Sequence, residues 1–417
     1  MAGKGRQVVG WVILSFIFFL LGNGTLSFTS LDEGRNRDAV QNMLKTLDFI
    51  SPVYNCQPRF EKPPLLYWLV ALSSLVFGLN EFAARLVSGL AATGVSLVTY
   101  FIAEGLYGEK IATKSLVILM TIPHLWILSR SVIPEMLNTF FALLGLYLFL
   151  QEQFVGEWIS SALAFLTKGP VGVILVLGIY WLWQRDRRIL NPTGLLAFCV
   201  LGLPWYLAMV YRHGYGYLYQ FFIYENFMRY TGQWQVFSFP FYYYFIIVLL
   251  ATIFYWPLYP KLVHHFRREW FPLVLWAGLV IGFFSLSRNK VHHYILLAYP
   301  PLAILLAQVA GRVYLRIAVT LAVSLVIFSQ PILHWYEQER LVPRAYPILA
   351  DYPGQVSFYK AEDSALVFYS QRCIPKVNRA EEAAGLVITK EKHLPDLHCQ
   401  PLLKGKEYDT TYVLCAK

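Results

Sequence analysis

The segment Thr29–Leu66, TSLDEGRNRDAVQNMLKTLDFISPVYNCQPRFEKPPLL, is a long charged loop that follows the first hydrophobic run of the chain. It opens with the adjacent acids Asp32 and Glu33, carries Arg35 just beyond them, and closes with Glu61–Lys62 before two prolines. A charged segment of this length between membrane-grade apolar runs is rarely a simple connector. Carboxylates that can take a proton and cations that can hold a phosphate are what a transferase needs at a bilayer surface.

Composition sets the class of protein. The chain has 417 residues, of which 57% are hydrophobic, 17% aromatic and 14% charged, and its net charge is +10. Soluble domains carry about 25% charged residues, so these values predict an α-helical polytopic membrane protein. The basic residues stand in short loops between apolar runs, where they act as topology signals rather than as a nucleic-acid surface. Lys4 and Arg6 precede a retained anchor with no small-residue cleavage site.

Apolar runs and loop charges together predict the topology. With about 17–25 apolar residues per span as a guide, we expect spans at 7–24, 83–104, 110–129, 132–151, 157–169, 170–184, 194–211, 241–260, 270–287, 293–310 and 312–332. The basic clusters at Arg185–Arg188 and Lys261–Arg268 then fall inside, together with the N-terminus.

The run Leu65–Leu79 is apolar but short, and it is entered through Pro63–Pro64. A crossing here would move the cluster Arg185–Arg188 to the outside, so we interpret the run as an interfacial or re-entrant helix within the outer loop 25–82. With that choice, charged residues from several loops share the outer side, which is the pattern of a site on a rigid scaffold. They are Asp32, Glu33, Glu61, Lys62, Glu135, Lys168, Arg229 and Lys290.

Polarity rises after about residue 334, which predicts two domains: a membrane domain, 1–333, and a small outer α/β domain, 334–417. Val356–Tyr359 and Leu386–Thr389 alternate as strands do, and Asp363–Gln371 and Arg379–Ala384 are expected to be short helices. Cys373, Cys399 and Cys415 lie in this domain. In an oxidising compartment they allow one disulfide, and buried free thiols are the alternative.

Each candidate site residue also has an ordinary structural explanation. Acids directly after a span are often solvated, and Arg35 and its charged neighbours could form ion pairs without a site. Glu135, after Pro134, could complement a helix N-terminus, and Lys168 could extend toward the interface. These explanations suit each residue alone, but they account less well for so many charged residues on one side of the membrane.

An ordered set of motifs carries a family resemblance. LDEGR, DFISPVYNCQPRFEKPPLLYWL, FGLNEFAARL, IPEMLNTFF, LTKGP, LPWYLA and YENFMRY occur in this order. The set resembles the bacterial polyprenyl-phosphate-sugar-dependent membrane glycosyltransferases, most closely the aminoarabinose transferases that modify lipid A and more distantly the protein O-mannosyltransferases. The resemblance implies the C-type glycosyltransferase superfold, with periplasmic juxtamembrane helices and a small C-terminal α/β domain.

The resemblance also implies residue roles. Asp32 would be the catalytic carboxylate, assisted by Glu135, with Glu33 and Glu61 in support. The donor phosphate would be bound by the matching residues Arg35, Lys62, Lys168, Arg229 and Tyr294, and Lys290 joins them as a cation on the same side. The chain would lie in the bacterial inner membrane, N-terminus cytoplasmic and C-terminal domain periplasmic.

The chain departs from the resembled family at several positions. Asn36 replaces a usual Tyr, Glu135 a usual Asp, and Tyr224 and Asn226 stand where aminoarabinose transferases resemble HEH. We therefore expect no required cofactor, although the acids, Glu61 among them, are candidates to hold a divalent metal ion. The expected partners are a polyprenyl-phosphate-linked sugar, a lipid or protein acceptor, and membrane lipids. A flippase for a lipid-linked sugar is the alternative function, disfavoured because no inverted repeats are visible.

Overall fold

The computed structural model describes residues 2–233 and 237–417, with side chains from residue 7 onward. The chain forms two compact units that each combine segments distant in sequence. The first comprises residues 1–21, 60–66 and 86–326, and the second comprises residues 22–59, 67–85 and 327–417. The predicted domain boundary at 333/334 stays a prediction. The two units are described separately.

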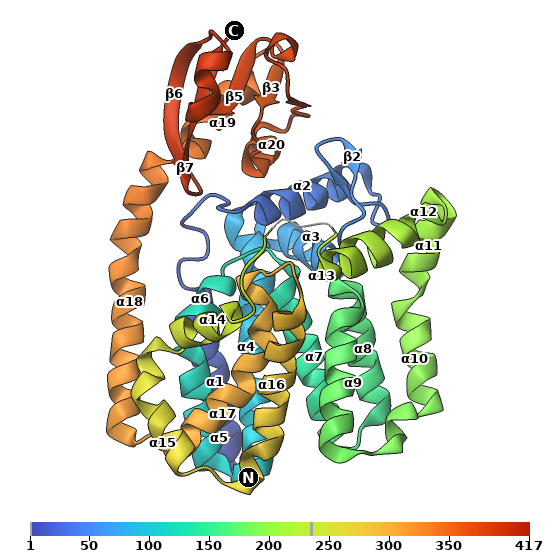
Figure 1. Ribbon diagram of the computed structural model, residues 1–417, viewed down its shortest axis with the longest axis vertical. Coiled ribbons are helices and arrows are strands. Elements are labelled where there is room, and N and C mark those ends of the chain that lie inside the picture. Colours follow the sequence, from blue (N-terminus) through green and yellow to red (C-terminus); the bar gives the residue numbers. More distant parts are fainter. Residues whose placement is uncertain (1, 234–236) are drawn as a thin grey trace. The chain divides into compact units, whose positions relative to one another are not determined.

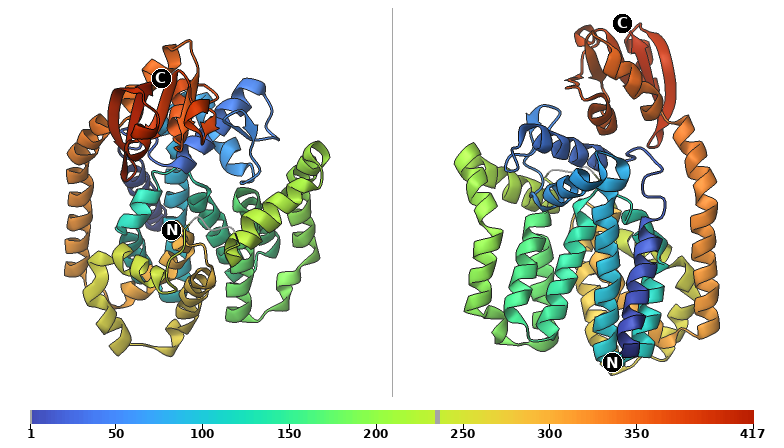
Figure 2. Two further views of the ribbon diagram at one scale, coloured as in Figure 1. Left: turned by 45° about the horizontal axis from the view of Figure 1, so that its top comes forward. Right: turned by 180° about the vertical axis from the view of Figure 1, so that it is seen from behind.

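The first unit is helical, and prolines begin several of its helices. Pro134, Pro170, Pro192 and Pro204 each occupy the first turn of a helix, where the absent N–H of proline costs no hydrogen bond. Helices α7, α8, α9 and α10 lie side by side in the views of Figures 1 and 2. The elements are α1 (Ala2–Leu20), α4 (Glu81–Tyr107), α5 (Glu109–Met120), α6 (Pro123–Leu128), α7 (Pro134–Leu150), α8 (Phe154–Lys168), α9 (Pro170–Gln184), η1 (Arg187–Leu190), α10 (Pro192–Gly202), α11 (Pro204–His213), α12 (Gly216–Leu218), η2 (Tyr219–Met228), α13 (Arg229–Thr231), α14 (Tyr243–Ala251), η3 (Ile253–Leu258), α15 (Tyr259–His264), η4 (Arg268–Trp270), α16 (Phe271–Leu286), η5 (His292–Ala298), α17 (Tyr299–Val309) and α18 (Arg312–Glu339).

The helices confirm the predicted polytopic membrane class. Among the described residues, five helices are long and apolar enough to cross a bilayer, or six if one bent pair forms a single span. Two of the predicted spans do not form one continuous helix. The run 110–129 divides because α5 ends at Met120 and Pro123 begins α6. The run 241–260 bends by 89° after Ala251, where the Thr252 hydroxyl donates back to the Val248 carbonyl at 2.7 Å.

Helix α3 (Leu65–Phe77) corresponds to the short apolar run of the first outer loop. Its 13 residues are fewer than a bilayer span requires. Leu72, Leu75, Val76 and Phe77 are exposed along it. A short helix with an uncovered apolar side suits the interfacial arrangement, which stays a prediction.

The second unit contains α2 (Leu31–Thr46), the hairpin β1 (Val53–Tyr54) and β2 (Gln57–Pro58), and a small α/β region. That region has the sheet order β4-β3-β5-β7-β6, in which β3 pairs in parallel with β4 and β5, and β7 pairs antiparallel with β5 and β6. Its elements are α19 (Val342–Asp351), β3 (Val356–Tyr359), α20 (Ser364–Ser370), β4 (Lys376–Val377), η6 (Ala380–Glu382), β5 (Leu386–Lys390), η7 (Glu391–Asp396), β6 (Gln400–Glu407) and β7 (Thr410–Ala416).

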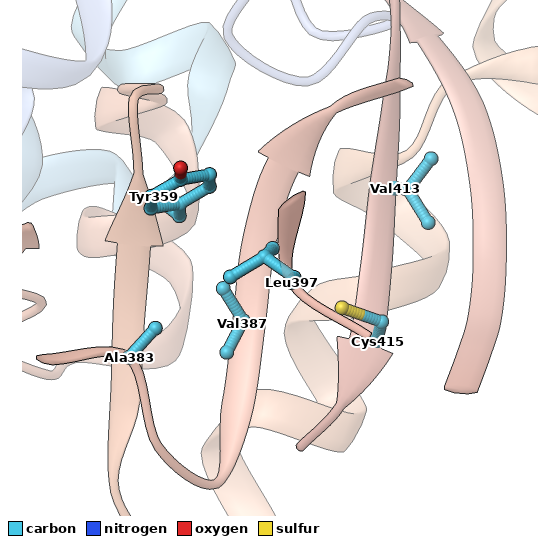
Figure 3. Close-up of a cluster of buried hydrophobic side chains, with 6 residues drawn as sticks. All are labelled: Tyr359, Ala383, Val387, Leu397, Val413 and Cys415. Atoms are coloured by element: carbon cyan, nitrogen blue, oxygen red, sulfur yellow. The ribbon is translucent and has the colours of Figure 1, made fainter. Parts of the chain in front are cut away.

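The predicted α/β character of the C-terminal region is confirmed, with β3, β5 and α20 close to their expected ranges. Figure 3 shows the buried cluster between the sheet and its loops, which includes Tyr359, Val387, Leu397 and Val413. Burying such side chains stabilises a domain by about 1.5–3 kcal/mol each. Gly385 directly precedes β5 and has φ +72°, and a Cβ there would lie 2.2 Å from the Gln355 carbonyl oxygen, so this turn requires glycine.

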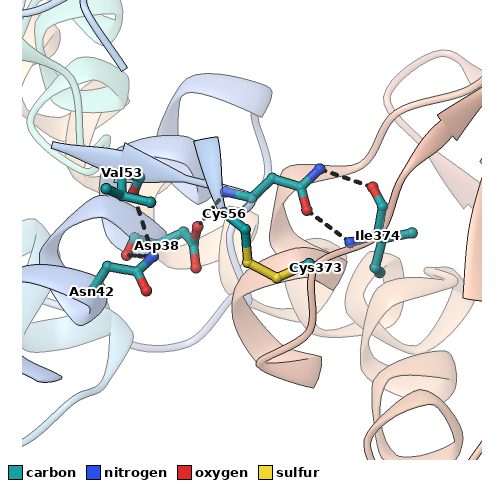
Figure 4. Close-up of a disulfide and its surroundings, with 7 residues drawn as sticks. Asp38, Asn42, Val53, Cys56, Cys373 and Ile374 are labelled. Atoms are coloured by element: carbon teal, nitrogen blue, oxygen red, sulfur yellow. Dashed lines mark hydrogen bonds between the residues drawn. A yellow bond between two sulfur atoms is a disulfide. The ribbon is translucent and has the colours of Figure 1, made fainter. Parts of the chain in front are cut away.

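Disulfides cross-link the second unit. Cys399, directly before β6, bonds to Cys415 of β7, which is one pairing among the three cysteines expected to allow a bridge. Cys56 of the β1–β2 turn bonds to Cys373, a link the sequence did not predict (Figure 4). Beside it, the Asn55 amide exchanges hydrogen bonds with the Ile374 backbone at 2.8 and 2.7 Å. The first outer loop and the C-terminal region are therefore covalently joined.

An acid is buried at the start of α20. One oxygen of Asp363 caps the helix by accepting from the Ala365 and Leu366 N–H groups at 2.9 and 3.1 Å. Burial, reinforced by the charge of Glu407, raises the pKa of Asp363 to about 7. Because the folded-state pKa lies above the unfolded value, ionising Asp363 costs stability, and that cost grows as pH rises toward 7.

Asp363→Asn is expected to stabilise the second unit at pH 8 and to have a much smaller effect at pH 5. Asn keeps the capping oxygen but carries no charge, so the difference between the two pH values should approach about 2–3 kcal/mol. Hydrogen exchange of the α20 amides in the full chain at both pH values measures it. Asp351→Asn, on an exposed helix position, is the control. An equal effect of Asp363→Asn at pH 5 and pH 8 would contradict the assignment.

Candidate active site

Lys168 lies at the tight connection between helices α8 and α9 of the first unit. Lys168 is the last residue of α8, and Gly169, with φ +80°, turns the chain directly into Pro170 of α9. A Cβ on Gly169 would come within 2.9 Å of Phe221, so glycine also allows η2 to approach closely. The motif TKGP thus fixes where the lysine ammonium projects.

Glu135 lies in the first turn of α7, just after Pro134, where the helix dipole favours a carboxylate. The side chain is 6% exposed and pairs with Lys168 at 3.0 Å. His293 Nε2 also lies 3.2 Å from the same oxygen, Glu135 Oε1. The Lys168 ammonium stands 4.2 Å from the centre of the Tyr294 ring, a favourable cation–π distance. Segments far apart in sequence therefore converge on Glu135 and Lys168.

The first five residues of the motif YENFMRY form the end of the π-helix η2, and its arginine, Arg229, begins α13. The Asn226 amide donates to the Phe221 carbonyl at 2.7 Å across the wide turn, and Arg229 pairs with Glu225 at 3.3 Å. π-Helical turns are rare and recur at functional sites. Here the turn presents Glu225, Asn226 and Arg229 to one pocket.

That pocket brings together most of the cations predicted to bind phosphate. Aromatic rings form much of its wall, and acids and cations gather at its polar part. The lining residues are Glu61, Lys62, Lys168, Val171, Phe221, Glu225, Asn226, Arg229, Tyr230, Phe283, Phe284, Ser287, Asn289 and Tyr294. Lys290 is not among them; its ammonium donates to the Ser287 carbonyl and its side chain is buried.

The adjacent acids of the first outer loop lie in the second unit and have different environments. Ser30 caps α2 by accepting from the Glu33 N–H at 3.2 Å. Glu33 is 1% exposed and binds the Arg85 guanidinium at 3.0 Å, so it is part of a buried ion pair. Asp32 is 42% exposed, and its carboxylate lies 3.9 Å from Arg59. Of the two acids, Asp32 is the one accessible to a substrate.

Arg35 is also in the second unit, where it pairs with Glu362 at 2.8 Å. Glu362 further accepts from Tyr54 at 3.1 Å and from Lys376. Burial alone would raise the pKa of Glu362, but the charges of Arg35 and Lys376 outweigh it and hold the pKa below its ordinary value. Arg35 thus ties α2 to the C-terminal region, and its predicted contact with phosphate stays a prediction.

The structure adds residues that the sequence did not single out. His293, Glu225 and Arg59 each contact a predicted site residue. Glu225 stands inside YENFMRY, and His293 directly precedes Tyr294, so proximity to a motif was the available signal. Within residues 2–233 and 237–417, no group of three or more His, Cys, Asp or Glu side chains is arranged to hold a metal ion.

Comparison with known proteins defines the class first. The crystal structure of ArnT from Cupriavidus metallidurans bound to undecaprenyl phosphate matches with a TM-score of 0.80 at 18% identity, over 98% of each chain. The chain therefore has the C-type glycosyltransferase fold. A family model described as dolichyl-phosphate-mannose-protein mannosyltransferase matches residues 61–212.

Relatives in sequence then define the family. An uncharacterized protein of Aquifex aeolicus (strain VF5) is 44% identical over 96% of this chain and 97% of its own length. An undecaprenyl phosphate-alpha-4-amino-4-deoxy-L-arabinose arabinosyl transferase of Pseudomonas aeruginosa (strain UCBPP-PA14) is 31% identical over 73% of this chain. The chain is similar to these membrane glycosyltransferases, as its motifs predict. It spans 59% of the length of that arabinosyl transferase.

Proposed function

We propose that the chain transfers a sugar from a polyprenyl-phosphate donor to a lipid A-like lipid or to a protein on the outer face of the bacterial inner membrane. The observation that carries the proposal is the pocket in which Lys62, Lys168 and Arg229 converge beside aromatic rings. A phosphate attached to a hydrocarbon chain needs both surfaces, cations for the head and apolar walls for the first isoprene units. The arabinosyl transferase of Pseudomonas aeruginosa, a relative of this chain, is named for undecaprenyl phosphate.

The chemistry follows from the leaving group. Breaking the bond between the sugar and the phosphate leaves a polyprenyl phosphate monoester, on which negative charge develops. Preorganised cations stabilise this charge, and one such group typically lowers the barrier by about 3–4 kcal/mol. Attack by the acceptor opposite the phosphate inverts the anomeric carbon.

We propose that Asp32 is the general base that accepts the proton of the acceptor hydroxyl. As a partly exposed carboxylate, Asp32 can orient an acceptor hydroxyl and remove its proton, a role worth on the order of 100- to 10,000-fold in rate. Glu135, held by Lys168, is assigned a supporting role. Glu61 lines the pocket and supports the cations there.

The function is tested by mass spectrometry of envelope lipids and glycoproteins from cells with and without the chain. We expect a sugar that appears on one of the two acceptor classes when the chain is present. Purified protein in nanodiscs with labelled undecaprenyl-phosphate sugars then identifies the donor. No sugar difference and no labelled product would overturn the proposal. The same assay with EDTA addresses metal: activity should persist, and loss that Mn²⁺ restores would make the acids ligands.

Lys62→Ala is expected to weaken both undecaprenyl phosphate binding and turnover by about tenfold or more, because one of the pocket cations is lost. Arg229→Lys should also lose affinity, since a lysine cannot reproduce the planar guanidinium fork beside Glu225. Binding by microscale thermophoresis and initial rates measure both effects. Lys261→Ala, an exposed lysine of α15, is the control. Wild-type affinity and rate in Lys62→Ala would show that Lys62 is an ordinary loop residue.

We further propose that the first outer loop and the C-terminal region face the periplasm. The Cys56–Cys373 disulfide supports a shared side, because a bond between two segments requires one compartment, and disulfides form in oxidising ones. The basic residues of Arg185–Arg188 support the opposite side for that loop.

Cysteine labelling is expected to follow this topology. In a Cys199→Ser background, an impermeant maleimide applied to intact spheroplasts should label Gln355→Cys and spare Arg187→Cys. Both positions are exposed, so the difference reports the side of the membrane rather than burial. Permeabilised cells, in which both positions should react, provide the control. The reverse pattern would overturn the assignment.

A further inference from the structure

The two carboxylate oxygens of Glu135 differ in their hydrogen-bond partners. Oε1 accepts from the Lys168 ammonium at 3.0 Å and lies 3.2 Å from His293 Nε2. Oε2 is buried and has no hydrogen-bond partner among the described residues. A buried carboxylate oxygen normally has a partner, so the unmatched acceptor indicates a place for a ligand donor. A carbohydrate hydroxyl is the donor that a glycosyltransferase substrate brings.

The position of His293 is fixed by its neighbours. It is the second residue of η5. The preceding residue, His292, forms a hydrogen bond between its Nδ1 and Nε2 of His124, at 2.7 Å. The other nitrogen of His124 bonds to the Tyr299 hydroxyl, so α6 and α17 hold the ends of η5 in place. The His293 ring also packs against the rings of His292 and Tyr294, at 5.0 and 5.4 Å between centroids. The imidazole is therefore preorganised beside Glu135.

The Lys168 ammonium is placed to interact with two anions. It lines the pocket proposed to bind the donor phosphate, and it also pairs with Glu135. When the phosphate binds, the ammonium is shared between two anions, and its hold on the carboxylate weakens. His293 does not line the pocket in the part of the chain that the structure describes, so its contact with Glu135 is independent of the phosphate.

We propose that His293 is a positioning residue: its Nε2–H donates to Oε1 of Glu135 and keeps Oε2 directed toward a carbohydrate hydroxyl of the donor or the acceptor. This inference rests on the proposed function. It requires no covalent step at His293. The His293 ring keeps the Glu135 carboxylate in one orientation while the Lys168 ammonium interacts with the phosphate.

Two substitutions separate this role from simple packing. His293→Gln places an amide N–H near the position of Nε2 but loses the aromatic ring. His293→Phe keeps the ring and its contacts with His292 and Tyr294 but cannot donate a hydrogen bond. Positioning predicts that kcat stays within about threefold of wild type in His293→Gln and falls about 10- to 100-fold in His293→Phe, with donor KM little changed, because a charged hydrogen bond is lost. Packing predicts the opposite order.

The experiment uses the full chain in nanodiscs, with undecaprenyl phosphate binding and infrared spectroscopy beside turnover. Both variants should bind undecaprenyl phosphate as the wild type does. The carboxylate band identified by its loss in Glu135→Gln should shift in His293→Phe and not in His293→Gln. This readout needs no sugar transfer, so it separates failure of this inference from failure of the proposed function. His264→Phe, on the exposed surface of α15, is the control.

Slow donor hydrolysis without acceptor distinguishes the two sources of the hydroxyl. If the donor sugar supplies it, His293→Phe slows hydrolysis and transfer alike. If the acceptor supplies it, transfer falls and hydrolysis does not. Full activity and an unshifted band in His293→Phe, with loss of activity in His293→Gln, would overturn the inference.

Discussion

Asp32→Asn is expected to remove nearly all sugar transfer while the protein remains as stable as wild type. Asn keeps the shape of the side chain and one acceptor oxygen, but it cannot take a proton from an acceptor hydroxyl. Loss of a general base costs on the order of 100- to 10,000-fold in rate. Asp32 is 42% exposed and the buried Arg59 is 3.9 Å away, so the substitution weakens a long ion pair. The initial rate of transfer and the thermal unfolding midpoint together measure the effect.

Glu33→Gln is the matched comparison, because the two acids are adjacent in sequence and differ in environment. Glu33 and Arg85 are 1% and 4% exposed, and their pairing at 3.0 Å neutralises both charges. Removing one member of a buried pair typically costs about 3–5 kcal/mol, so this variant should lose stability first. If Asp32→Asn instead stays active, the base must be sought elsewhere, with Glu33 and Glu135 the next candidates.

Lys168→Met is expected to weaken donor binding strongly and to remove most of the turnover, for two reasons. The pocket loses a cation that we propose binds the donor phosphate, and Glu135 loses its charged partner at 3.0 Å. The phosphate contact alone is worth about 3–4 kcal/mol in the transition state, or some 100- to 1,000-fold in rate. Undecaprenyl phosphate binding by thermophoresis and transfer rates at saturating donor separate the two contributions.

The double variant Lys168→Met with Glu135→Gln sharpens this test. Removing both charges relieves the unpaired buried carboxylate, so thermal stability should recover toward wild type. Activity should not recover, because neither the phosphate cation nor the carboxylate is restored. Wild-type affinity for undecaprenyl phosphate in Lys168→Met would place the donor phosphate outside this pocket.

Local sequence signals predicted the elements on which the pocket is built. The pairs Ile133–Pro134 and Gly169–Pro170 mark helix starts because proline lacks an N–H and glycine tolerates positive φ. These positions set Glu135 and Lys168 at helix ends before any packing is considered. The ordered motifs contain Lys62 and Arg229, the resemblance they carry added Tyr294, and the structure places all three around one pocket. Such information is local, so a single sequence contains it.

The tertiary structure decided how those positions are partnered. Charge alone made Asp32 and Glu33 equivalent, and only packing against Arg85 buries one of them. Arg35 meets Glu362, and Cys56 meets Cys373 across a sequence separation of 317 residues. His293 reaches Glu135 because η5 is held against α6. The composition, the apolar runs and the helix starts marked by proline could be read from the sequence alone, because none of them depends on which distant segments meet. Ion pairs, the Cys56–Cys373 bond and the orientation of Glu135 depend on which distant segments pack together, and that is set by the free energy of the whole fold rather than by any local pattern.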